Sequence, residues 1–89
     1  MSPLRSLAYS LPPGAASTWH AHPSPPFAYV IEGAVVIESE SPIEVKAGHA
    51  IAEPTCEIIR AVNRGPVPTK LVIFYVAPPL TPFLEEVRR

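Results

Sequence analysis

The sequence predicts an all-β protein, whose series of short strands suits a small barrel or a jelly roll. Short apolar runs rich in β-branched residues recur along the chain, and Pro, Gly or Ser ends nearly every one of them. The pair Glu32-Gly33 lies between two runs of Val and Ile, which indicates a tight hairpin, because Gly tolerates the positive φ angle of such a turn. Strands therefore explain the spacing of the apolar residues better than helices do.

The expected strands are short, and turn residues separate them. Ser41-Pro42 and Ala47-Gly48 are two further turn signals, and Pro78-Pro79 ends the last strand. The short proline-rich stretch 23–26 is expected to fix a loop. Beyond the last strand, residues 83–89 are expected to form one helical turn or to fray. In chain order, the predicted strands are residues 7–11, 17–22, 27–32, 34–39, 43–46, 50–53, 58–63 and 70–76.

Length and composition allow one globular domain, which we place at residues 1–89. The chain has 89 residues, of which 47% are hydrophobic and 17% charged. A chain of this size buries only about 60 to 65% of its unfolded surface, which leaves a thin core. Self-association would supplement such a core, so we expect a homodimer.

The charge pattern and the single cysteine narrow the partners and the compartment. Seven Lys and Arg residues against eight Asp and Glu residues give a net charge of -1, with no long basic cluster, so nucleic acid is not an expected partner. The longest apolar run, residues 71–77, is far shorter than a membrane span, so no membrane is expected either. Cys56 has no second cysteine to pair with, and no apolar secretory signal opens the chain, which favours the cytoplasm.

The strongest chemical signal is the pair His20 and His22. On a strand, residues two apart project from the same face, with their Cα atoms about 6.5 to 7 Å apart. This spacing suits two ligands of one metal ion, because imidazole binds Zn, Cu, Fe and Ni well. The alternative is a pair of solvated or core histidines without a metal, and the pair alone does not decide between them.

The sequence around the histidines resembles the first motif of the cupin superfamily. That motif reads Gly, five residues, His-x-His, three or four residues, Glu, six residues, Gly. The segment 14–33 keeps every spacing from Gly14 to Gly33, but Pro26 stands at the Glu position. The segment 48–63 resembles the second motif through Gly48, Pro54 and Asn63, whereas Cys56 replaces its Gly and Ile59 replaces its His.

The resemblance implies a cupin fold, which is a small antiparallel barrel of the jelly-roll type with six to eight strands. Such barrels are often dimeric, and their mouth opens on a small pocket. In cupins of the usual kind, three histidines and one glutamate bind a metal ion, most often Fe, Mn, Ni, Zn or Cu. His20 and His22 are the two of those four ligands that this chain retains, since Pro26 has no donor atom and Ile59 is a hydrocarbon. A complete four-ligand site at these positions is excluded, so any metal is expected to be weakly held.

Three other residues are candidates to compensate for the lost ligands. Glu53 has the strand parity of Ile51 and is a possible third metal ligand, although a glutamate at a strand end is more often a solvated charge at the rim. His49 is interpreted as a rim residue, with metal contact as the alternative. Cys56 lies in a turn, where a structural role is favoured over a thiolate ligand.

Aromatic residues alternate with the residues expected to face the barrel interior. If the histidines point inward, Trp19, Phe27 and Tyr29 face outward, where they would serve packing or a dimer interface. The interior would then be lined by four small or aliphatic residues beside the imidazoles, and such a pocket suits a small organic ligand. These lining residues are Ala28, Val30, Ile59 and Ala61.

Two functions follow from these observations. In the first, the protein is a cupin module that binds a small organic ligand, with or without a divalent metal at His20 and His22, and is non-catalytic or of unknown activity. In the second, it is a metal-dependent enzyme of the oxygenase or isomerase type, in which the metal acts as a Lewis acid or activates O2. The loss of two ligands favours the first, because open catalytic sites typically retain three protein ligands.

Overall fold

The computed structural model describes residues 4–76 and 85–86, the last two by their backbone. These residues form nine strands: β1 (Leu4–Leu11), β2 (His20–Ala21), β3 (Phe27–Glu32), β4 (Ala34–Glu38), β5 (Ile43–Lys46), β6 (Ala50–Ala52), β7 (Arg60–Val62), β8 (Thr69–Val76) and β9 (Glu85–Glu86). The described part of the chain contains no helix, and so none that would be long and apolar enough to cross a membrane.

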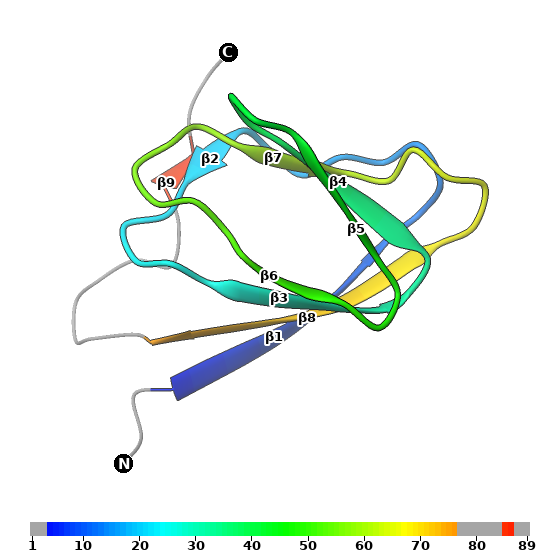
Figure 1. Ribbon diagram of the computed structural model, residues 1–89, viewed down its shortest axis with the longest axis horizontal. Coiled ribbons are helices and arrows are strands. Elements are labelled where there is room, and N and C mark those ends of the chain that lie inside the picture. Colours follow the sequence, from blue (N-terminus) through cyan, green and yellow to red (C-terminus); the bar gives the residue numbers. More distant parts are fainter. Residues whose placement is uncertain (1–3, 77–84, 87–89) are drawn as a thin grey trace.

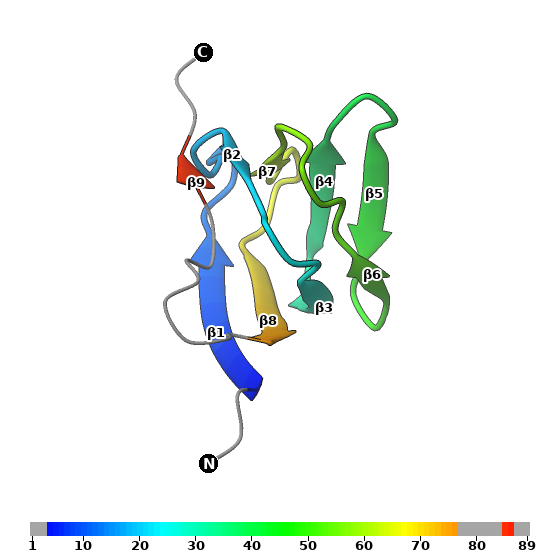
Figure 2. The same ribbon diagram turned by 90° about the vertical axis from the view of Figure 1, so that its left-hand side faces the viewer.

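The strands form two facing sheets and a small two-stranded ribbon, all antiparallel. One sheet has the order β1-β8-β3-β6, the other has the order β5-β4-β7, and β2 pairs with β9 (Figures 1 and 2). The hydrophobic core lies between the two larger sheets, and the buried side chains of both contribute to it. Its members are Ala28, Val30, Val35, Ile37, Val45, Ile59, Leu71 and Ile73. The expected all-β architecture is confirmed.

The turn glycines adopt the backbone conformation that the sequence requires of them. Gly33, between β3 and β4, has a φ angle of 76°, and Gly48, between β5 and β6, has a φ angle of 85°. Side chains with a Cβ atom rarely adopt such angles. Both glycines therefore end one strand and reverse the chain into the next, as expected.

Two segments differ from the prediction by more than a shift of strand ends. The strand expected at residues 17–22 is reduced to β2, because residues 16–20 run beside β7 through isolated bridges, Ala16 with Val62 and His20 with Ile59, in place of a continuous ladder. The prediction of a helical turn or frayed end is wrong for Glu85 and Glu86, which form β9 and pair with Ala21 and His20. The rest of 83–89 lies outside the described residues.

Candidate functional site

His20 and His22 lie together inside the barrel, as the His-x-His spacing predicts. Both side chains are buried, and their ring centroids are 4.7 Å apart with the rings nearly perpendicular. The backbone of His20 exchanges two hydrogen bonds with Ile59, and the carbonyl of His22 accepts one from the amide of Cys56. The segment that carries the pair is thus held by the chain around the second motif.

Glu53 lies beside the histidines although it follows a different strand, directly after the end of β6. Ala52 lies opposite Phe27 in the β3–β6 ladder, and the next hydrogen bond runs from the amide of Glu53 to the carbonyl of Pro26. Residues 26 and 53 are therefore neighbours, directly before β3 and directly after β6. The carboxyl of Glu53 thus lies next to the position at which the first motif lacks its Glu.

The three side chains form a cluster of the kind that holds a metal ion. All three are buried, and one ligand atom from each lies within 4.8 Å of the others. Nε2 of His22 and Oε1 of Glu53 are 4.0 Å apart. This distance is too long for a hydrogen bond between the two atoms. It is within reach of one metal ion bound to both, because two metal–ligand bonds of about 2.1 Å each can join atoms up to about 4.2 Å apart.

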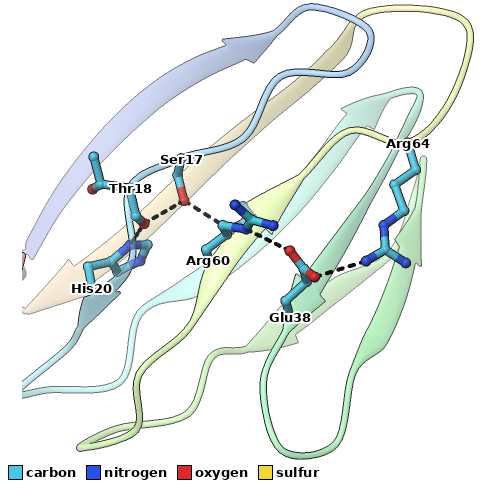
Figure 3. Close-up of polar contacts among 7 residues, drawn as sticks. Ser17, Thr18, His20, Glu38, Arg60 and Arg64 are labelled. Atoms are coloured by element: carbon cyan, nitrogen blue, oxygen red, sulfur yellow. Dashed lines mark hydrogen bonds and ion pairs between the residues drawn. The ribbon is translucent and has the colours of Figure 1, made fainter. Parts of the chain in front are cut away.

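A hydrogen bond to the backbone orients the imidazole of His20. Its Nδ1 atom lies 2.7 Å from the carbonyl oxygen of Thr18, which can only accept a hydrogen bond, so the proton is on Nδ1 and the lone pair is on Nε2 (Figure 3). The Ser17 hydroxyl donates to the same carbonyl and accepts from the amide of Ala61. Such second-layer hydrogen bonds are typical of metal-binding histidines, because they fix the tautomer and the ring.

The environment of Glu53 favours the binding of a cation beside its carboxyl group. Its side chain is 4% exposed, and its Oε2 atom has no hydrogen-bond partner among the described residues. Burial raises the pKa of this carboxyl to about 7, because the apolar surroundings disfavour the charged form. A divalent ion between the carboxylate and the imidazoles would compensate the buried charge, so the residues present fit a metal of the kind that cupins bind.

The cluster opens on a mostly apolar pocket of about 180 Å³. Leu11, Ile37, Leu71 and Ile73 supply much of its wall. Ala61 lines the pocket, as expected. Ala28, Val30 and Ile59 are buried in the barrel interior, as expected, but they are not among the residues that line this pocket. Tyr9 lies at the edge of the pocket and is 42% exposed. Tyr9 was not among the residues predicted from the sequence, although it is two residues from both Leu7 and Leu11 and so shares their face of the first strand.

The other candidate ligands lie elsewhere. His49 is exposed, contributes its backbone carbonyl to Val30, and lies outside the cluster. Cys56 is also exposed and outside the cluster. It has a positive φ angle of 57° at the position where the second motif has Gly. The interpretation of His49 as a rim residue and of Cys56 as a turn residue agrees with these positions.

The aromatic residues expected on the outside are found there. Phe27 and Tyr29 are about half exposed on the outer face of β3. Trp19 packs under the guanidinium of Arg60, whose Cζ atom is 4.6 Å from the ring centroid. Arg60 and Arg64 both pair with Glu38 on this outer surface (Figure 3), and these ion pairs lower the pKa of its carboxyl.

Comparison with solved structures shows the same architecture at low sequence identity. A Cupin 2 conserved barrel domain protein from Salinispora arenicola matches with a TM-score of 0.74 and 18% identity over 82% of this chain and 62% of its own. An uncharacterized protein with a double-stranded β-helix domain from Klebsiella pneumoniae matches with a TM-score of 0.79 and 22% identity over 100% of this chain and 78% of its own.

A third match is a sugar phosphate isomerase of the cupin superfamily from Silicibacter pomeroyi. Its TM-score is 0.74 and its identity 26%, over 85% of this chain and 52% of its own. The chain therefore spans less than two thirds of the isomerase and of the Salinispora protein. No curated protein matches it significantly. The cupin domain family itself matches residues 8–75, which is most of the sequence, and the chain therefore belongs to the cupin family.

Proposed function

We propose that the protein binds one divalent metal ion through His20, His22 and Glu53 and presents it to a small organic ligand in the barrel pocket. The observation that carries this proposal is the burial of Glu53 beside the two imidazoles, with its Oε2 atom lacking a hydrogen-bond donor in the described chain. Uncompensated burial of a carboxylate is costly, and a cation removes most of that cost.

The two imidazoles and one carboxylate of the site favour a divalent transition metal or Zn. Two imidazoles and one carboxylate bind Zn and Fe(II) in other proteins, and they also suit Mn, Ni and Cu. Three protein ligands leave positions open for a ligand from solution. A divalent ion held there would supply Lewis acidity. The chain's own residues fix the orientation of the imidazoles, the apolar wall excludes water from the pocket, and the ligand would enter past Tyr9.

The geometry also favours a second candidate, a metal-dependent enzyme of the oxygenase or isomerase type. Glu53 raises the number of available protein ligands from two to three, which is the usual number in open catalytic sites. The similarity to a sugar phosphate isomerase is compatible with this candidate.

The cytoplasmic location of the protein remains a prediction from the sequence.

Metal analysis of protein purified without a histidine tag tests the proposal. We expect about one equivalent of Zn, Mn, Fe or Ni after reconstitution, together with a rise in Tm that EDTA reverses. His20→Ala, His22→Ala and Glu53→Gln should each reduce metal uptake at least tenfold. His49→Ala and Glu57→Gln make the same chemical changes outside the cluster and should leave uptake unchanged. Equal uptake by the cluster variants and these controls would refute the site.

A further inference from the structure

The charge of the pocket restricts what it can accept. With the imidazoles neutral as ligands, Glu53 provides one negative charge, so a divalent ion would leave a net charge of +1. No Lys or Arg side chain of the described residues lines the pocket. Arg60 and Arg64 are held by Glu38 on the outer surface. The loaded site would therefore have one positive charge to neutralise and, within residues 4–76, no basic side chain that would hold a second negative charge.

The walls of the pocket restrict the rest of the ligand. The aliphatic side chains of Leu11, Ile37, Leu71 and Ile73 surround a volume of about 180 Å³. A cavity of roughly 150 Å³ with aliphatic and aromatic walls accepts benzene. The pocket thus suits an apolar body about the size of one six-membered ring, and it offers few partners for the hydroxyl groups of a sugar.

Tyr9 adds a hydrogen-bond donor at the edge of the pocket. Tyr9 lines the same pocket as Glu53. A tyrosine phenol has an ordinary pKa of about 10 and is protonated at neutral pH. A protonated phenol stabilises an anionic oxygen, because hydrogen bonds to charged acceptors are stronger than neutral ones.

We propose that the pocket, once His20, His22 and Glu53 hold a divalent ion, binds a small monoanion with an apolar body, such as an aromatic or branched-chain monocarboxylate. This inference rests on the proposed metal site. It separates the chain from proteins that bind dianionic, hydroxyl-rich ligands such as sugar phosphates, because those ligands would leave a net negative charge among aliphatic walls.

The test is a calorimetric comparison of four ligands on the protein loaded with Zn, which is redox-inert. Benzoate is the monoanion, benzamide its neutral isostere, phenyl phosphate a dianion at pH 7.5 with the same body, and glucose 6-phosphate a sugar phosphate. We expect benzoate to bind with a stoichiometry of one per chain, at least tenfold more tightly than the other three. Protein treated with EDTA should bind benzoate at least tenfold more weakly.

Two variants locate the ligand in this pocket. Ala61→Leu fills the pocket and should weaken benzoate binding about tenfold without changing Zn uptake, whereas Ala52→Leu makes the same change on an exposed strand and should have no effect. Tyr9→Phe removes the hydroxyl and should weaken benzoate binding about three- to tenfold. Circular dichroism establishes that each variant is folded.

The outcomes separate this inference from the function on which it rests. Normal Zn uptake combined with equal affinity for benzoate and benzamide would overturn the monoanion proposal and leave the metal site intact. Tighter binding of phenyl phosphate or glucose 6-phosphate would have the same consequence. Failure to take up Zn, or any other ion tested, would overturn both proposals.

Discussion

Glu53 is the residue on which the proposed metal site of this barrel depends. Its carboxyl lies beside the imidazole of His22, with the second imidazole of His20 in the same cluster and the phenol of Tyr9 along the same pocket. The apolar surroundings favour its neutral form, and a bound cation would favour its charged form. One side chain would thereby connect the stability of the barrel with the binding of the proposed metal ion.

This connection predicts a pH dependence of the metal-free protein. The pKa of Glu53 is raised from 4.5 in the reference state to about 7 in the fold, so the native state holds the proton more tightly than the unfolded state. The stabilisation from this group is complete below pH 4.5 and is lost as the pH rises through 7. Between pH 5 and pH 8 we expect the free energy of unfolding to fall by about 2–3 kcal/mol from this residue.

Urea unfolding in EDTA measures the effect, with Glu53→Gln as the reference. The glutamine is neutral at every pH, so the difference between the two proteins isolates Glu53 from the contributions of the histidines. We expect this difference to change in the stated direction, and Zn to restore the stability of the parent at pH 8. Parallel pH profiles of parent and variant would contradict the burial of an ionisable Glu53.

At the scale of elements, the β3–β4 hairpin fixes the relation between the two sheets. Gly33 has a φ angle of 76°, and a Cβ atom added there would lie 2.7 Å from the carbonyl oxygen of Pro68. The hydroxyl of Thr69, on the same side, donates to the carbonyl of Ala34. The hairpin and the start of β8 are therefore packed backbone to backbone, which leaves no room for a side chain at this turn.

Gly33→Ala should consequently be more damaging than the same change at another left-handed glycine. Gly14 has a φ angle of 81°, but an added Cβ atom would have no neighbour within 4 Å. We expect Gly14→Ala to cost about 1 kcal/mol from backbone strain alone, and Gly33→Ala about 2–4 kcal/mol from strain and overlap together. Urea unfolding of both variants measures the costs, and equal values would show that the Pro68 contact relaxes freely.

At the scale of the whole molecule, the outer face of the sheet β1-β8-β3-β6 is unusually apolar. In the strand register, Phe27 lies opposite Phe74 and Tyr29 opposite Val72. Phe27 is 53% exposed, Tyr29 44% and Phe74 41%. Monomeric proteins rarely expose a contiguous apolar patch of this kind, and the thin core of a short chain benefits from further burial.

We therefore propose that two copies of the chain associate through this face, as a homodimer. Phe27→Lys and Phe74→Lys should each shift the protein toward the monomer at about 10 µM, because a desolvated ammonium opposes apolar burial. Val67→Lys, an equally exposed apolar position in a loop, is the control and should leave the mass unchanged. Light scattering measures the mass, and a monomeric parent protein would rule out the dimer.

Much of this structure follows from information local in the sequence. Strand alternation placed β3 and β5 at their observed bounds, and glycines marked the turns at Gly33 and Gly48, because these signals depend on residues close together in the chain. The His-x-His spacing likewise placed both imidazoles on one side, since two residues on an extended chain share a face.

Other features depend on contacts between distant parts of the chain. Strand parity made Glu53 a candidate, but the β3–β6 register decided that its carboxylate stands opposite Pro26 and beside the histidines. The pairing of Glu85–Glu86 with β2 had no local signal, because two glutamates carry neither β propensity nor apolar alternation. Local periodicity determines which face a residue occupies, whereas the partner across that face is determined only when the sheets close into a barrel.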